Sequence, residues 1–168
     1  VVALNAAITR GVIVRYIANS GTLNSALDGS IVPVEFPNLK LNGSALMHNK
    51  FMIVDQDSED NSWVMSGSMN LTSNNISDDF NNILFIQDQS LAKAYTLEFN
   101  EMWGGDGPSP SVFTVKVGDQ KEDNTPHNFI IGGDLVESYF SPSDNTTNAI
   151  SGSLLTADND IQFAVLSF

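Results

Sequence analysis

The chain has 168 residues, a hydrophobic fraction of 42% and a formal net charge of -13. This length is enough for one domain with a core, and no apolar run approaches the length of a membrane span. The chain has no cysteine, which excludes disulfides and thiolate metal sites. Residues 51–92 and 122–168 contain no Lys or Arg, so the surface repels polyanions and disfavours tight non-specific nucleic-acid binding. A soluble chain is expected, with secreted and periplasmic locations left open.

The first part of the chain predicts a helix, a strand and a long loop. Residues 2–9 place apolar side chains on one helical face, and Gly11 follows where a left-handed helix stop is needed. Residues 12–17 are apolar on both sides, which is typical of an interior strand. Residues 18–46 are rich in Asn, Gly and Ser and predict a loop; such a loop beside a motif strand often shapes a pocket rim.

Residues 47–55 predict a strand in which His48 and Lys50 project from the same face. An imidazole can attack or carry a proton near neutral pH, and an ammonium supplies a fixed positive charge. A Lys among apolar neighbours needs an anionic partner, because burial of an unpaired ammonium is costly. The pair therefore indicates a site that receives a phosphate, although a His-x-Lys taken alone is more often a surface feature.

Residues 63–66 predict the return strand of a hairpin whose loop is 56–61. The segment 67–70 follows, where small and amide residues can bring N–H groups to an anion. Residues 71–79 are polar and carry no predicted element. The spacing of a calcium loop is missing, so four acids around the hairpin loop predict a solvated turn. These acids are Asp55, Asp57, Glu59 and Asp60.

Residues 82–86 predict a strand and residues 91–103 predict an amphipathic helix. Asp88 or Ser90 can cap the start of this helix, and Gly104-Gly105 can end it. The aromatic side chains on its apolar face are expected to belong to the core.

Beyond the helix, residues 105–133 are rich in Gly, Pro, Ser and Asp and predict a linker. His127 follows a proline there and is expected to be structural. Residues 135–140 predict a strand, residues 144–157 a helix and residues 161–168 a further strand. Because this strand runs to the last residue, we expect a chain cut from a longer parent.

The motif and the segments around it resemble the phospholipase D superfamily. The residues of the HKD signature are His48-x-Lys50-x-x-x-x-Asp55, followed by Gly67-Ser68-x-Asn70. Residues 10–15 resemble the helix-to-strand turn before the motif in that family, and residues 82–103 resemble the strand and helix after it. The resemblance covers most of residues 1–104. It implies an α/β fold with a mixed β-sheet flanked by helices.

The same resemblance divides the chain into three parts. Residues 1–104 correspond to the HKD-bearing part of a phospholipase D-like domain, and residues 105–133 to a linker. Residues 134–168 resemble the first strand-helix-strand of a second repeat. Because residues 1–104 alone would leave sheet edges uncovered, we expect residues 134–168 to complete that sheet, within the same chain or by swapping.

The resemblance implies a metal-independent phosphodiesterase that needs no cofactor and uses two histidines, one from each HKD motif. One histidine forms a phosphohistidine and the other protonates the leaving alkoxide, before water completes hydrolysis. His48 takes one of these roles, while Lys50 and Asn70 stabilise the phosphoryl oxygens. The implied site comprises His48, Lys50, Asn70 and Asp55 as catalytic or bracing residues, with Gly67 and Ser68 binding substrate.

One position departs from the family pattern. The family often has an acid downstream of the motif that orients the imidazole. At the matching place this chain has Asn81, with Asp79 two residues earlier. If neither side chain reaches the imidazole, the histidine loses control of its tautomer.

One motif supplies one histidine, so the second must come from a homodimer or from a second repeat in a longer chain. The expected substrate is a phosphodiester, either phospholipid or nucleic acid. Two alternatives follow: an HKD-type endonuclease, or an inactive single-motif fragment that acts as an interaction module. The acidic charge weakens the nucleic-acid alternative.

Overall fold

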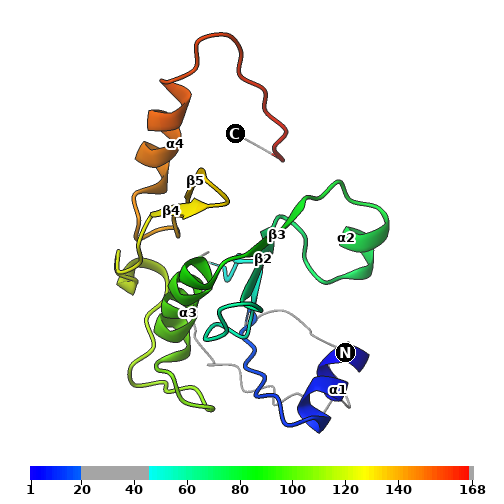
Figure 1. Cartoon of the computed structure of the whole chain (residues 1–168). Coiled ribbons are helices and arrows are strands. Elements are labelled where there is room, and N and C mark those ends of the chain that lie inside the picture. Colours follow the sequence, from blue (N-terminus) through cyan, green and yellow to red (C-terminus); the bar gives the residue numbers. More distant parts are fainter. Residues whose placement is uncertain (20–45, 167–168) are drawn as a thin grey trace.

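The protein is described by a computed structural model that covers residues 1–19 and 46–166. Three antiparallel strands form one sheet in the order β1-β2-β3, and β4 and β5 form a separate antiparallel pair (Figure 1). The strands are β1 (Phe51–Val54), β2 (Trp63–Gly67), β3 (Ile83–Gln87), β4 (Asn128–Ile131) and β5 (Asp134–Glu137). The helices are α1 (Val2–Thr9), α2 (Ser73–Ser77), α3 (Gln89–Trp103) and α4 (Thr146–Leu154), with a 3-10 turn at Gly118–Gln120. The α/β class is therefore confirmed.

The predicted hairpin is confirmed as β1 and β2. Phe51 pairs with Ser66 at one end and Val54 with Trp63 at the other. Asp55 starts the turn with a φ of 47°, a conformation that Asp tolerates better than most residues. Its carbonyl oxygen accepts a hydrogen bond from the hydroxyl of Ser62 at 2.7 Å, which closes the turn.

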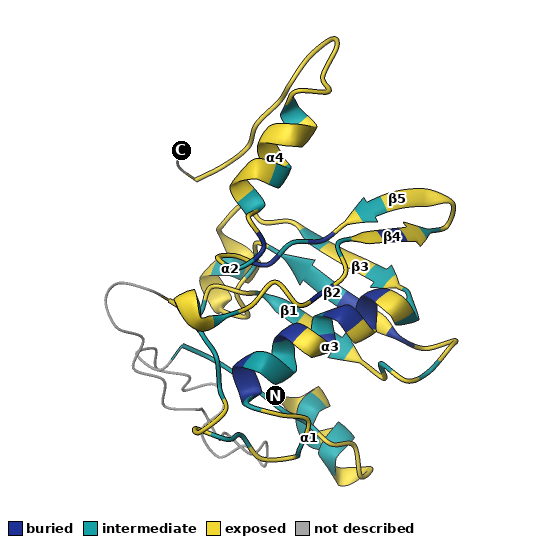
Figure 2. Ribbon diagram, turned by 90° about the vertical axis from the view of Figure 1, so that its left-hand side faces the viewer, coloured by how far each residue is buried: buried dark blue, intermediate teal, exposed yellow. Residues whose placement is uncertain are grey.

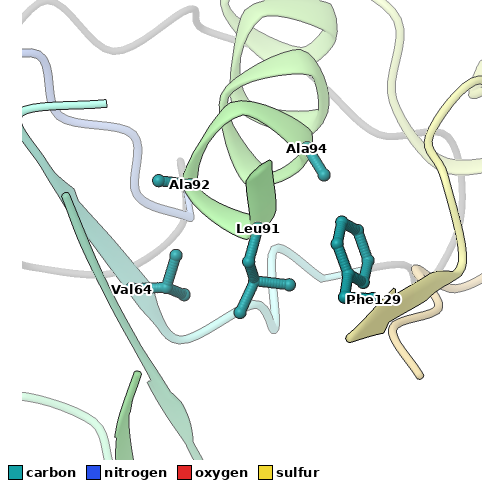
Figure 3. Close-up of a cluster of buried hydrophobic side chains, with 5 residues drawn as sticks. All are labelled: Val64, Leu91, Ala92, Ala94 and Phe129. Carbon is teal, nitrogen blue, oxygen red and sulfur yellow. The ribbon is translucent and has the colours of Figure 1, made fainter. Parts of the chain in front are cut away.

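Helix α3 packs on one face of the three-stranded sheet. The carboxylate of Asp88 accepts a hydrogen bond from the Leu91 N–H at 2.8 Å, and Gly104 ends the helix at a φ of 85°. The predicted capping residues are confirmed at both ends, and the helix starts two residues earlier than predicted. Figure 3 shows the core that results, where α3, β2 and β4 contribute buried side chains: Val64, Leu91, Ala92, Ala94 and Phe129.

An aromatic cluster links β1, α3 and the segment after β5. The ring centroids of Phe51 and Tyr95 are 5.2 Å apart, and those of Tyr95 and Phe140 are 4.9 Å apart. Both pairs are edge-to-face, a geometry worth about 0.5–1.5 kcal/mol each beyond the area buried. The chain around residue 140 is thereby packed against the motif-bearing hairpin.

The segment predicted as a linker follows the surface of α3. The Trp103 indole donates to the Gly107 carbonyl at 2.9 Å, and the Lys116 N–H donates to the Glu101 carbonyl at 3.0 Å. The ammonium of Lys121 forms an ion pair with the buried carboxylate of Glu98 at 2.6 Å. These contacts make the first part of the segment a support for the helix. The division of the chain near residues 104 and 133 remains a prediction.

In the first part of the chain, one predicted strand is too long and another is wrong. Residues 47–50 lie outside β1, because polar groups redirect them: the Asn49 amide donates to Glu98 on α3, and Lys50 turns back to the carbonyl of His48. Residues 12–17 form neither helix nor strand. Arg15 draws that segment to α3, where its guanidinium donates to Asn100 at 2.8 Å and lies over the Phe99 ring at 4.8 Å.

The last part of the chain also differs from the expectation. The strand predicted at 135–140 is β5, the helix predicted at 144–157 is the shorter α4, and residues 161–166 form no strand. Because β5 pairs with β4, these residues do not extend the sheet of β1–β3 within the chain. Figure 2 shows α4 and the segment after it largely exposed.

Most of the predicted loop 18–46 lies outside the described residues, as do residues 167–168. Helix α2 was not predicted; its cap is Thr72, whose hydroxyl accepts from the Asn75 N–H at 3.4 Å. Among the helices of residues 1–19 and 46–166, none is both long enough and apolar enough to cross a bilayer.

Candidate functional site

His48 and Lys50 of the HKD motif lie at the same end of the three-stranded sheet as residues 67–70. Phe51 at the start of β1 pairs with Ser66 near the end of β2, and Gly67 at the end of β2 pairs with Ile83 at the start of β3. Antiparallel pairing therefore brings the residues before β1, after β2 and before β3 to the same end of the sheet. We call residues 48–50, 67–70 and 79–82 the motif end of the sheet.

The His48 side chain is exposed at the motif end. Among the described residues, none forms a hydrogen bond with its ring. The ammonium of Lys50 donates to the His48 carbonyl at 2.7 Å, and partial burial lowers the pKa of Lys50 from its ordinary value. Between them, the Asn49 amide is directed to the Glu98 carboxylate at 3.3 Å. Asn49 thus anchors to α3 the segment that carries His48 and Lys50, the two predicted site residues.

Gly67 allows β2 and β3 to approach closely at the motif end. A Cβ atom at this position would lie 3.0 Å from the carbonyl carbon of Asn82 and closer still to its oxygen. The Ser68 N–H donates to that same carbonyl at 3.1 Å, and the Asn82 N–H donates back to the Ser68 hydroxyl at 3.1 Å. The glycine and serine of the motif therefore hold the two strand ends together.

Asn70 begins a network of amides beside the strand ends. Its N–H donates to the Asn75 side-chain oxygen at 2.7 Å, and the Asn75 amide donates to the Asp79 carboxylate at 2.6 Å. The Asn81 amide donates to the Asn75 carbonyl at 3.2 Å, while its oxygen accepts from the Ser68 hydroxyl at 3.0 Å. Asp79 and Asn81 thus order the turn that carries Asn70, and no hydrogen bond in the described chain joins either of them to His48.

Asn75 is the member of this network that the sequence analysis did not name. It lies in α2, within a polar stretch that gave no periodic signal. The available signal was the spacing Thr72-x-x-Asn75, which is typical of a capped first helical turn.

Asp55 lies at the opposite end of the hairpin. It is on the order of 16 Å from Lys50 along the strand, at about 3.3 Å per residue. Its carbonyl accepts from the Ser58 N–H at 2.9 Å as well as from Ser62. This position suits a residue that braces the turn, and it separates Asp55 from the other motif side chains.

A shallow apolar depression of about 330 Å³ lies on the opposite sheet face from α3, and it is lined by Met52, Val54, Trp63, Met65 and Phe85. None of the motif side chains lines it. His48, Lys50 and Asn70 therefore lie apart from this depression, at the motif end of the sheet.

The α/β fold and the convergence of the two half-motifs define a domain of the phosphodiesterase type. Residues 1–103 match the family described as cardiolipin synthase, PLD-like domain. The chain therefore belongs to this family of the phospholipase D superfamily, as the resemblance predicted. Comparisons with curated proteins and with solved structures give no significant match.

Proposed function

We propose that the chain supplies one half of a phosphodiesterase site that hydrolyses a phospholipid phosphodiester through a phosphohistidine. The observation that supports this most is the meeting of His48, Lys50 and Asn70 at one end of the sheet in a member of the PLD-like family. The His48 ring is exposed and can reach a substrate laid across this end.

In the first step, a ring nitrogen of His48 donates its lone pair to phosphorus and a P–N bond forms. The bond from phosphorus to the leaving oxygen breaks, and that oxygen takes a proton from a second histidine. In the second step, water gives a proton back to the second histidine and its oxygen attacks phosphorus. The P–N bond breaks, which restores His48 and releases a phosphomonoester.

The charge that develops on the non-bridging oxygens requires donors in fixed positions. Lys50 supplies an ammonium next to the nucleophile, and substrate would replace the His48 carbonyl as its partner. Asn70 supplies an amide on a turn that Asn75 holds by a 2.7 Å hydrogen bond. Gly67 and Ser68 set the position of that turn against β3.

The second histidine is proposed to be His48 of another copy of the chain, or its equivalent in a second repeat. The single HKD motif supports this proposal, because one motif supplies only one of the two histidines that the mechanism requires. Two copies that meet at their motif ends would place two imidazoles across one substrate and exclude water from between them.

A phospholipid fits the observations better than a nucleic acid. The family description names cardiolipin synthase, and cardiolipin is a phospholipid. The net charge of -13 repels a polynucleotide along its whole length, whereas one phosphodiester group needs only a local cation such as Lys50.

The test is hydrolysis of bis(p-nitrophenyl) phosphate in the presence of EDTA. We expect His48→Ala and Lys50→Ala to lower kcat/KM on the order of 100-fold or more, because each removes a group that acts at the reacting phosphorus. Lys93→Ala is the matched control, since Lys93 is exposed on α3 and outside the motif end. Its rate should equal that of the unchanged chain.

Size-exclusion chromatography with light scattering should show a dimer in the active preparation. Activity that survives His48→Ala, or that requires a metal ion, would refute the mechanism. An inactive monomer would favour the single-motif interaction module. Parallel assays with phosphatidylcholine vesicles and with single-stranded DNA distinguish a phospholipase from an endonuclease.

A further inference from the structure

A histidine and two aspartates meet at the base of the β4–β5 hairpin. His127 precedes β4, Asp123 lies four residues earlier in the chain, and Asp144 follows β5. The Nε2 atom of His127 is 3.0 Å from an Asp123 carboxylate oxygen, and its Nδ1 atom is 3.9 Å from one of Asp144. One ligand atom from each residue can be chosen so that all three lie within 4.8 Å of one another.

The hydrogen bonds of His127 determine which nitrogen is available for a cation. Nδ1 lies 2.9 Å from the carbonyl oxygen of Ser138, which can only accept, so Nδ1 carries a proton and donates. The other nitrogen, Nε2, faces the Asp123 carboxylate, which also can only accept. Two electron-rich atoms 3.0 Å apart repel unless a proton or a metal ion lies between them. A backbone carbonyl on the second nitrogen is the arrangement that usually orients a metal-binding histidine.

Two of the three side chains of this cluster, His127 and Asp144, are already held in position. The His127 ring stacks on Tyr139 with centroids 4.4 Å apart and an interplanar angle of 20°. The Asp144 side chain is 2% exposed. Its two oxygens accept from the Phe140 N–H at 2.7 Å and the Ser143 hydroxyl at 2.6 Å. Ligands held by packing and by such hydrogen bonds lose little freedom when a metal binds.

One neutral donor lies on each oxygen of Asp144, which leaves further lone pairs for a cation and does not neutralise the charge of the carboxylate. Together with Asp123 it places two negative charges around one imidazole in a chain of net charge -13. A divalent cation would balance both carboxylates. One imidazole nitrogen with two carboxylate oxygens suits Zn²⁺, which accepts these ligands and can take water as the fourth.

We propose that Asp123, His127 and Asp144 bind one Zn²⁺, which joins the two ends of the β4–β5 hairpin. The role is structural: the ion ties the chain before β4 to the chain after β5, where Phe140 packs against β1 and α3. The proposal is independent of phosphodiester hydrolysis, because its ligands lie outside the motif end.

The test is isothermal titration calorimetry of the EDTA-treated, dialysed chain with ZnCl₂, with Co²⁺ absorption spectra as a second readout. We expect one ion per chain and visible absorption bands from bound Co²⁺. His127→Gln and Asp123→Asn should each weaken binding by roughly 100-fold or more, since even loss of a residue that only orients a ligand costs 10–100-fold.

Two variants serve as controls. His48→Gln removes the only other histidine of the chain, and Asp134→Asn removes an exposed carboxylate on β5 outside the cluster. Both should keep the affinity and the Co²⁺ spectrum. Circular dichroism in EDTA shows whether each variant is folded before titration.

The proposal fails if Zn²⁺ does not bind, or if binding survives His127→Gln. In either case His127 and Asp123 do not hold a metal ion between them. A chain that binds Zn²⁺ as expected but does not cleave a phosphodiester supports the zinc site and refutes the enzyme. A chain that cleaves in EDTA and binds no metal does the reverse.

Discussion

Replacement of Lys121 by methionine tests whether the chain beyond residue 103 belongs to the same folding unit as the motif. The Lys121 ammonium and the Glu98 carboxylate are 2.6 Å apart, and their side chains are 3% and 1% exposed. Burial is the main cause that raises the pKa of Glu98, and the neighbouring Lys121 opposes it. The same carboxylate accepts from the Asn49 amide, so the ion pair also supports the segment between His48 and Lys50.

Lys121→Met leaves the Glu98 carboxylate buried without a cation. Removal of one partner from a buried ion pair costs about 3–5 kcal/mol of the free energy of unfolding. For a chain of this size, that corresponds to a fall of roughly 6–20 °C in Tm. The matched control is Lys116→Met, because Lys116 and Glu122 are also 2.6 Å apart but are 39% and 64% exposed. There the loss should stay below about 1 kcal/mol.

The assay is urea unfolding followed by circular dichroism, extended to the double variant Glu98→Gln/Lys121→Met. Because the glutamine of this variant would keep an oxygen for Asn49 without a buried charge, the double variant should regain at least about 1 kcal/mol relative to the sum of the single losses. Equal, small effects of Lys121→Met and Lys116→Met would contradict the argument and would make residues 104–144 an independent attachment.

Two further predictions concern the motif end. Gly67→Ala should cost about 1–3 kcal/mol of unfolding free energy, because the new methyl group collides with the Asn82 carbonyl. The control is Gly152→Ala in α4, where the methyl group meets nothing within 4 Å and should stabilise the chain by up to about 1 kcal/mol. Urea melts that give both variants the same stability would count against the close approach of β2 and β3. Burial lowers the pKa of Lys50 below 10.5, so kcat/KM should fall as the pH rises through that lowered value. Lys50→Arg should move this decline to higher pH, because a guanidinium keeps its charge. A decline that stays at the same pH in the variant would show that the charge of Lys50 is not used.

Sequence reasoning succeeded where the determining signals are local. The pairing of β1 with β2 follows from two largely apolar segments on either side of a polar loop. Helix α3 follows from apolar periodicity together with Asp88 before it and Gly104 after it. These signals act within a few residues of one another, so they are visible without knowledge of the fold.

Strand predictions failed where the outcome depended on a distant partner. Residues 12–17 have the composition of an interior strand, yet Arg15 is drawn to Asn100, which is 85 residues away. The segment 161–168 has the same composition, and its described part pairs with no strand. A strand forms only where a neighbour offers free backbone groups, and composition alone cannot supply that information.

The motif was recognisable from the sequence, whereas much of its arrangement in the fold was not. The spacing of His48, Lys50 and Asn70 identified the motif, and antiparallel pairing places all three at the motif end of the sheet. The link from Asn49 to Glu98 was not visible, because it joins residues whose proximity is a product of folding. The surroundings of His127 were hidden for the same reason: Asp144 approaches it only once β4 and β5 are paired.

The chain carries two tryptophans in contrasting surroundings, with Trp63 38% exposed on β2 and Trp103 1% exposed at the end of α3. Their fluorescence should therefore separate by wavelength, with the shorter-wavelength emission from Trp103. Since the Trp103 indole is hydrogen-bonded to Gly107, a red shift of that emission would report release of the segment after α3 from the helix, before the sheet itself melts.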